Sequence, residues 1–266
     1  MNFHKYSATG NDFVLLDNRD QKISISNELL FQNICHRKFG IGADGVLLVE
    51  NSENYDFKMI YINSDGREAE MCANGCRAIC HYVKTILNIN SSGAEPTYVF
   101  ETMNGVYQGV LSNNDFVKIK MTEVSNLGKI SIDDLFDSKS NLYLEVGVPH
   151  CVYEVDQELL EDLNIFDIGK KIRNDKRFTN GVNVNFFSVL GENEVAIRTY
   201  ERGVEDETLS CGTGATAVAI NCFEKMSMKG PIHIQTKGGE LVVSKENSVF
   251  FLSGQVVNTF RGIYEI

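Results

Sequence analysis

The chain has 266 residues, which is enough for one large domain or for two modest domains that each bury a core. A formal net charge of −11 and a sequence pI of about 5.0 argue against a nucleic-acid partner, because phosphates need a basic surface. The chain has no run of about 18 apolar residues for a membrane span, and its first residues lack the apolar core of a signal peptide, so we expect a cytoplasmic protein without a membrane partner.

The first third of the chain predicts a hairpin, a helix and two further strands. Residues 3–17 indicate two strands joined by a tight turn at 8–12, and a glycine-rich loop leads into a strand at 46–49. The strand at 57–62 ends in a second turn signal. A helix capped at residues 26–27 is expected to end near Gly40. We expect four of its side chains on the apolar face: Leu29, Leu30, Ile34 and Phe31.

The rest of the chain alternates strands with helices. Three short runs at 97–101, 106–111 and 117–121 indicate an antiparallel meander, and residues 159–173 predict one or two helices. Further strands are predicted at 142–146, 151–153, 182–187, 195–200, 232–235, 241–244, 249–252 and 260–264. We place a domain boundary near residues 118–123, with domains at 1–120 and 121–252. The last strand, about 253–266, is expected to return to the first domain.

Two stretches of the sequence resemble each other. Cys72 and Cys211 each precede a run of small residues that opens into an apolar helical pattern, which places both thiols at a helix N-terminus. The unpaired N–H groups and the dipole of a helix start stabilise a thiolate and can bind a carboxylate. Two such sites suggest two similar halves that present one thiol each to a shared cleft. A thiolate and a thiol on opposite faces of one carbon can exchange its proton with inversion.

Each helix is expected to bury one stripe. The stripe of the first helix comprises Ile79, Tyr82, Val83, Ile86 and Leu87, and that of the second comprises Ala215, Val218, Ala219, Cys222, Phe223 and Met226. The run from Gly212 to Gly214 lacks the lysine and the full spacing of a phosphate loop, so it is a weak nucleotide signal.

Seven cysteines, an odd number without disulfide-framework spacing, agree with a reducing compartment. Most cysteines in proteins behave as small buried hydrophobic residues, and three of the seven fit this role: Cys35, Cys151 and Cys222. Cys72, Cys76 and Cys80 recur at every fourth residue and could recruit a soft metal along one helix face. Because no Cys-x-x-Cys or His-x-x-x-His pair closes such a site, we predict no metal centre.

Several motifs in order resemble the diaminopimelate epimerase family, the cofactor-independent epimerases and racemases with two catalytic cysteines. The motifs are Thr9-Gly10-Asn11-Asp12-Phe13, Gly40-Ile41-Gly42-Ala43-Asp44-Gly45, Asn63-Ser64-Asp65-Gly66, Cys72-Ala73-Asn74-Gly75-Cys76-Arg77, Glu201-Arg202-Gly203 and Cys211-Gly212-Thr213-Gly214-Ala215. The resemblance implies an α+β fold of two similar domains, each a curved, mostly antiparallel sheet around a central helix, with the active site in the cleft between them. It also implies an isomerase that serves lysine and peptidoglycan-precursor biosynthesis and needs neither pyridoxal phosphate nor a metal.

The resemblance assigns roles by motif position. Cys72 and Cys211 would be the two bases, and His150 with Glu201 would adjust the pKa values of the thiols. The part of the substrate remote from the reacting carbon would be held by Asn11, Asn63 and Asn183. The α-carboxylate would accept from N–H groups of Ala73, Asn74, Gly212 and Thr213. Further substrate contacts would come from Glu201 and Arg202. The implied partner is a small amino acid, and the resemblance leaves open whether the chain forms a homodimer.

The sequence departs from the family at two places, and alternatives stay open. Gly147-Val148-Pro149-His150 stands where the family usually has Gly-Asn-Pro-His, and the acidic segment 204–208 is longer than the common spacing. Loss of an amide from a polar pocket can change specificity strongly, so a racemase of another amino acid remains an alternative. The seven cysteines also leave open a thiol redox or metal-binding module without turnover, and spacing alone does not exclude a Schiff-base enzyme.

Overall fold

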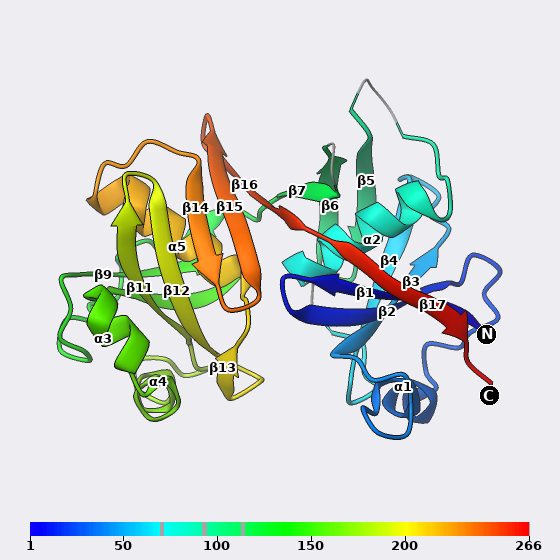
Figure 1. Ribbon diagram of the computed structural model, residues 1–266, viewed down its shortest axis with the longest axis horizontal. Coiled ribbons are helices and arrows are strands. Elements are labelled where there is room, and N and C mark those ends of the chain that lie inside the picture. The colour runs from blue at the N-terminus through cyan, green and yellow to red at the C-terminus, as the bar shows by residue number, and fades with distance from the viewer. Residues whose placement is uncertain (70–71, 92–94, 113–114, 266) are drawn as a thin grey trace. The chain divides into compact units, whose positions relative to one another are not determined.

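We describe a computed structural model of the chain, at residues 1–69, 72–91, 95–112 and 115–265. The chain divides into two compact units, which are coloured along the chain in Figure 1. The first unit comprises Met1–Lys120 with Ser253–Ile266, and the second comprises Met121–Leu252. The C-terminal strand therefore belongs to the first unit.

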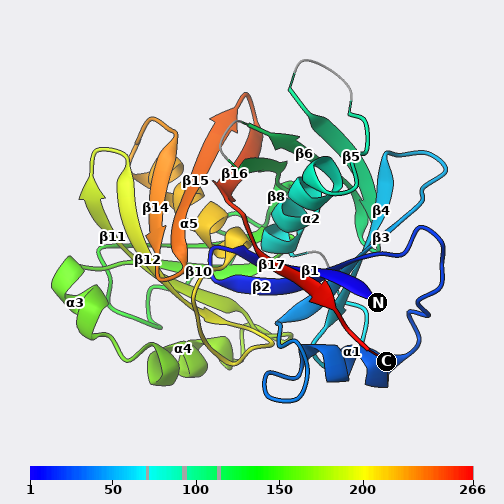
Figure 2. The ribbon, with the colours of Figure 1, turned by 45° about the vertical axis from the view of Figure 1, so that its right-hand side comes forward.

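The first unit is a mixed sheet with two helices. Its elements are β1 (Asn2–Ala8), β2 (Asn11–Asp17), α1 (Glu28–Cys35), β3 (Gly45–Glu50), β4 (Phe57–Asn63), α2 (Ala73–Thr85), β5 (Thr97–Thr102), β6 (Gly105–Leu111), β7 (Phe116–Lys120) and β17 (Val257–Ile263). Strand β1 pairs antiparallel with β2 and with β17, which lies beside it in Figure 2. Strand β2 runs parallel to β3, β3 antiparallel to β4, and β4 parallel to β5. Strands β5, β6 and β7 form the predicted antiparallel meander.

The second unit follows the same plan. Its elements are β8 (Val124–Ser125), β9 (Ser140–Val146), β10 (Val148–Glu154), α3 (Gln157–Asp162), α4 (Ile165–Arg173), β11 (Asn183–Gly191), β12 (Glu194–Glu201), β13 (Asp206–Thr208), α5 (Gly212–Lys225), β14 (Ile232–Thr236), β15 (Gly239–Glu246) and β16 (Val249–Gln255), the last of which continues into the first unit. Strands β9 and β10 are antiparallel, β10 and β11 parallel, β11 and β12 antiparallel, and β12 and β14 parallel. These relations match those of β1 to β5, so the prediction of two similar α+β domains is confirmed.

In each unit the cysteine-bearing helix is the central one. Helix α2 contacts β1, β2, β3, β6 and β7, and every residue from Ala73 to Val83 is buried. Helix α5 contacts β9, β10, β11, β12 and β15 and lies behind the strands in Figure 1. The residues of both predicted stripes are buried or half-buried, and each helix also buries residues outside its stripe, because a sheet that curves around a helix leaves it no wide solvent face. Small residues such as Gly75 and Gly214 allow this close approach.

Outer helices cover the other face of each sheet. Helix α1 buries Phe31 and Ile34 against side chains of β2 and β3, and α3 and α4 pack on β11 and β12. Helix α1 ends at Cys35 rather than near Gly40, and Leu29 is 65% exposed rather than on the apolar face. The chain folds back there, and the N–H of Ile41 and of Ala43 donates to carbonyls of the last helical turn, which ends the helix.

Candidate active site

The two family-motif cysteines occupy the same local position in their units. Cys72 is the N-cap of α2 and Cys211 the N-cap of α5, with extended backbones at φ −111°, ψ 120° and φ −127°, ψ 113°. The predicted placement at helix N-termini is therefore confirmed. The first intrahelical bonds run from Cys76 N to Cys72 O and from Ala215 N to Cys211 O. The N–H groups of the preceding residues in each first turn, including those of Ala73, Asn74, Gly212 and Thr213, therefore lie at the positive end of the helix dipole, where a thiolate or a carboxylate is stabilised.

Cys211 is held in place by the first turn of α5. Its Sγ accepts a hydrogen bond from the backbone N–H of Gly214 at 3.4 Å and lies 3.5 Å from Oγ1 of Thr213. A Cβ on Gly214 would come within 2.3 Å of Oδ1 of Asn185 and 3.3 Å of the cysteine Sγ. Only glycine at this position lets the start of α5 approach β11 so closely.

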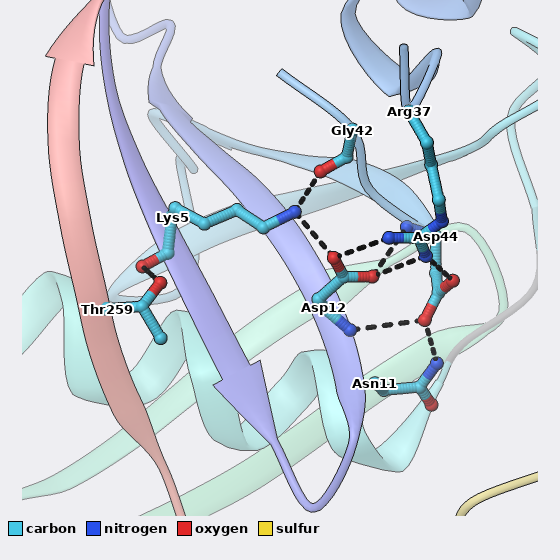
Figure 3. A network of polar contacts seen from close by, with 7 residues as sticks. All are labelled: Lys5, Asn11, Asp12, Arg37, Gly42, Asp44 and Thr259. Atoms are coloured by element: carbon cyan, nitrogen blue, oxygen red, sulfur yellow. Dashed lines mark hydrogen bonds and ion pairs between the residues drawn. The ribbon is translucent and has the colours of Figure 1, made fainter. Parts of the chain in front are cut away.

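In the first unit, Asn11 connects the β1–β2 hairpin to the start of α2. Its Oδ1 accepts from Nδ2 of Asn74 at 2.8 Å. Its own Nδ2 donates to Asp44 at 2.8 Å, as Figure 3 shows. Asp44 also accepts from the backbone N–H of Asp12. The hairpin, the loop before β3 and the first turn of α2 are thereby fastened together beside Cys72.

A buried ion pair supports this arrangement from the outer side of the hairpin. Nζ of Lys5 lies 2.6 Å from the carboxylate of Asp12 and also donates to the carbonyl of Gly42, while Arg37 binds both Asp12 and Asp44 (Figure 3). Burial alone would raise the pKa of Asp12, but hydrogen bonds and charges from Arg37 and Lys5 lower it to about 2. Asp12 is therefore a carboxylate at neutral pH.

In the second unit, His150 is fully buried beside Asn185. Nδ1 of His150 lies 3.2 Å from the amide nitrogen of Asn185, so Nδ1 accepts and the neutral ring carries its proton on Nε2. Burial, followed by the positive charge of Arg202, lowers the pKa of His150 to about 3. Nε2 has no hydrogen-bond partner among the described residues, so the predicted pairing with Glu201 is not made directly through this atom. The joint role of His150 and Glu201 stays a prediction.

The low pKa of His150 gives a stability prediction. The unfolded chain binds a proton on this ring near pH 6.5, whereas the folded chain does so only near pH 3. Stability contributed by the neutral buried ring is therefore complete above pH 6.5 and falls below it, by at most about 1.4 kcal/mol per pH unit. We expect the wild type to lose more unfolding free energy between pH 7 and pH 4 than His150→Gln, measured by urea unfolding. Parallel losses in both proteins would contradict this.

Asn183 and Glu201 lie where β11 begins and β12 ends. Oδ1 of Asn183 accepts from the backbone N–H of Arg202 at 2.8 Å, and its Nδ2 donates to the carbonyl of Pro149 at 3.2 Å. A carboxylate oxygen of Glu201 accepts from Thr208 at 3.0 Å, and Arg202 donates to the carbonyl of Asn180. Asn183 thus ties the segment before His150 to the segment after Glu201.

Corresponding strand ends carry the predicted substrate contacts in both units. Asn63 is the last residue of β4, as Glu201 is of β12. Asn11 is the first residue of β2, and the equivalent first residue of β10 is Val148. The departure from the family motif therefore falls at a position that bears an amide in the other unit. The longer acidic segment forms the short strand β13, where Glu207 pairs with Arg198 at 2.7 Å.

Sequence reasoning missed three polar residues of this region, namely Asp44, Arg77 and Asn185. Asp44 and Arg77 stand inside the recognised motifs, and Asn185 follows Asn183 at the spacing that puts both on one strand face. Asn185 is fully buried, donates to the carbonyl of Cys151 at 2.9 Å and accepts from Thr199 at 3.0 Å. These bonds hold the amide that orients the His150 ring.

Two findings bear on other kinds of site. Within the residues that the structure describes, no group of three or more histidine, cysteine or acidic side chains could hold a metal ion. In the same residues, none of the helices has the length and apolarity needed to span a bilayer.

Solved structures define the class of fold. A phenazine biosynthesis protein of the PhzF family from Bacillus anthracis superposes with a TM-score of 0.76 at 15% identity, over 100% of this chain and 99% of its own. A probable proline racemase from Agrobacterium radiobacter gives a TM-score of 0.69 at 12% identity, over 100% of this chain and 93% of its own. The chain thus has the two-domain α+β fold that those proteins share, with a central helix in each domain.

Sequence comparison identifies the family within this class. The model of the diaminopimelate epimerase family matches residues 3–127 and 142–257. The diaminopimelate epimerase of Flavobacterium psychrophilum is 40% identical over 268 residues, which cover 98% of this chain and 99% of the relative. The chain belongs to the diaminopimelate epimerase family.

Proposed function

We propose that this protein interconverts LL- and meso-diaminopimelate by a two-base 1,1-proton transfer, with Cys72 and Cys211 as the bases. One observation carries the proposal: each unit of this family member places a cysteine at the N-cap of its central helix, in nearly the same backbone conformation. A duplicated thiol at a duplicated helix start supplies the two acid–base groups that inversion at one carbon requires.

In the proposed reaction one cysteine enters as thiolate and removes the α-proton. The other cysteine enters as thiol and delivers a proton to the opposite face, so the two thiols exchange protonation states in each turnover. In the reverse direction their roles are exchanged. The α-proton of an amino acid is far less acidic than a thiol, so the enzyme must stabilise the carbanion as it forms.

The two helix N-termini are suited to this stabilisation. Backbone N–H groups of Ala73, Asn74, Gly212 and Thr213 would bind the α-carboxylate and place fixed positive potential where negative charge develops. Such preorganised donors need no rearrangement when the proton moves. This chemistry uses neither pyridoxal phosphate nor a metal ion.

The remaining motif residues are proposed to bind the substrate and to adjust the pKa values of the two thiols. Asn11, Asn63 and Asn183 would hold the distal amino-acid group of the substrate, and Glu201 and Arg202 would contact it from the end of β12. The proton on Nε2 of the neutral His150 ring is a donor that can stabilise a thiolate, and Glu201 would complete this adjustment. The proposed setting is the cytoplasm, where diaminopimelate feeds lysine and peptidoglycan synthesis.

Isotope exchange tests the proposal directly. LL-diaminopimelate is incubated with the protein in deuterated water. The stereoisomers are then separated, and the deuterium content of each is measured by mass spectrometry. We expect meso-diaminopimelate to form with one deuterium at the α-carbon, while the LL pool recovered at early times carries little label. Each base holds its own proton, so the abstracted proton and the delivered deuteron do not mix. Equally rapid labelling of both pools would contradict two separate bases.

A second candidate keeps the reaction but changes the substrate. Val148 replaces an amide at the start of β10, at the position equivalent to Asn11. A pocket without that amide would bind a distal ammonium and carboxylate less well and an apolar side chain better. A panel of diaminopimelate, lanthionine, histidine, proline and simple amino acids separates the two candidates, since the preferred substrate has the highest kcat/KM.

A further inference from the structure

Helix α2 carries a fully buried arginine in its second turn. Arg77 is 0% exposed, and one of its terminal nitrogens, Nη2, donates to Oγ1 of Thr9 at 2.9 Å. Its Nε and Nη1 have no hydrogen-bond partner among the described residues, and no carboxylate in that part of the chain pairs with it. A buried charge without a countercharge costs several kcal/mol, and groups with strongly shifted pKa values cluster at functional sites.

The guanidinium of Arg77 bonds the same hairpin turn as the first turn of α2 does. Long side chains on a helix point back toward its N-terminus, which directs Arg77 toward the first turn. Its partner Thr9 belongs to the β1–β2 turn, and two residues later Asn11 accepts from Asn74 in that first turn. Both bonds join the same hairpin turn to the same end of the helix. The N-cap of this end is Cys72.

A negative charge on a thiolate of α2 and the positive charge on the guanidinium of Arg77 stabilise each other. Burial lowers the pKa of Arg77 to about 10, while the anionic forms of Cys72 and Cys76 act to raise it. The guanidinium is therefore charged at neutral pH. Burial raises the pKa of Cys76 well above its ordinary value, so Cys76 stays a thiol. The half-buried Cys72 is the thiol whose ionised form the guanidinium can stabilise.

Three titratable groups on the strand β1 beside α2 do not supply this charge, namely His4, Tyr6 and Lys5. His4, Tyr6 and Tyr107 face the helix from β1 and β6, and His81 on α2 bonds Tyr6 and Asp115. Burial lowers the pKa of His4 and raises that of Tyr6 to about 12, so both are neutral at pH 7. Lys5 faces the opposite side of the hairpin, where Asp12 neutralises it.

We infer that Arg77 is the built-in countercharge of the Cys72 thiolate, a positioning residue that favours ionisation of this thiol through its electric field and touches no substrate. The buried nitrogens exclude direct contact with a ligand. The inference rests on the proposed role of Cys72, but it concerns the thiol itself and can be measured without turnover. An inactive protein with an acidic Cys72 would overturn the proposed function and leave this inference standing.

Alkylation of Cys72 by iodoacetamide as a function of pH tests the inference. The measurement uses the full chain with Cys211→Ser, so that Cys72 is the reactive thiol, in four forms: Arg77, Arg77→Met, Arg77→Lys and Lys84→Met. The charge of a neighbouring guanidinium typically lowers the pKa of an ionisable group by about 1–3 units. Arg77→Met should therefore raise the apparent pKa of Cys72 by at least about 1 unit and slow alkylation at pH 7 about tenfold. Arg77→Lys should react faster than Arg77→Met, and Lys84→Met, at the far end of the helix, should match the parent.

Thermal unfolding read together with the pH profile separates this role from a structural one. Arg77→Met loses the hydrogen bond to Thr9 in either case, so only the countercharge role predicts that the apparent pKa of Cys72 rises as well. A lower melting temperature together with an unchanged pH profile of Cys72 would overturn the inference. The parent chain gives an independent test if the variants do not fold. A buried countercharge is screened little by salt, so the apparent pKa of Cys72 should move by less than about 0.3 units between 0.05 and 1 M KCl. A larger rise would overturn the inference in favour of an exposed helix dipole.

Discussion

Cys72→Ala and Cys211→Ala should each lower kcat/KM for diaminopimelate epimerisation by about 10²–10⁴-fold or more, because each removes one of two acid–base groups. In the proposed mechanism both thiols act on one carbon, so the effects of the two substitutions should not add. The double variant should be no slower than the slower single variant. The measurement is the initial rate of LL to meso conversion, followed by separation of the stereoisomers.

Matched controls come from the same two helices. Cys80 on α2 and Cys222 on α5 are fully buried, and burial raises the pKa of both thiols, to about 12 for Cys222. Cys80→Ala and Cys222→Ala lose only a small buried group and should keep kcat/KM within a few fold of the wild type. A single Cys72 or Cys211 variant that retains a tenth of the activity would contradict the two-base mechanism.

Most of the fold followed from sequence because its signals are local. The β1–β2 hairpin, the meander of β5 to β7 and the strands around each central helix were expected within a few residues of their observed bounds. Turn residues and alternating apolar positions act within a few residues of one another, so a single sequence records them. The duplication was also visible, since Cys72 and Cys211 begin similar helices.

What the sequence did not predict depends on contacts between distant segments. The burial of every α2 residue from Ala73 to Val83 arises because strands from both ends of the unit close around the helix, which a helical stripe does not reveal. The short strands β8 and β13 are stabilised by pairing with β9 and β12 rather than by their own residues. The end of α1 at Cys35 depends on the chain that folds back over it.

The same limit applies to the candidate site. Motif position predicts Cys72, Cys211 and the strand-end residues as site residues, but the hydrogen bonds around them join residues far apart in sequence. Asn11 and Asn74 are 63 positions apart and share a hydrogen bond of 2.8 Å. Arg77 reads as an ordinary helical arginine until its burial is known. Spacing predicts the reacting groups, whereas only the packed structure shows which charges surround them.

Asp12→Asn should lower the free energy of unfolding by about 2–4 kcal/mol at pH 7. The change removes the carboxylate that neutralises Lys5, whose side chain is 8% exposed, and breaking a buried ion pair costs about 3–5 kcal/mol. The lower expected range reflects the 21% exposure of the Asp12 side chain. Asp17→Asn is the matched control on the same strand. Asp17 pairs with Arg19, both are 37% exposed, and its loss should cost no more than about 1 kcal/mol.

The difference in unfolding free energy between wild type and Asp12→Asn should depend on pH in a way that identifies its origin. The folded-state pKa of Asp12 is about 2 and its ordinary value is 3.8, so its contribution is complete above pH 3.8 and is lost as the pH falls toward 2. Urea unfolding of wild type and Asp12→Asn should show a constant gap from pH 7 to pH 5 and a narrowing gap at pH 3. Because the same carboxylate and Arg37 hold Asp44 against Asn11, the variant should also raise KM more than it lowers kcat. Equal stability losses in Asp12→Asn and Asp17→Asn would show instead that the Lys5 pair contributes no more than an exposed one.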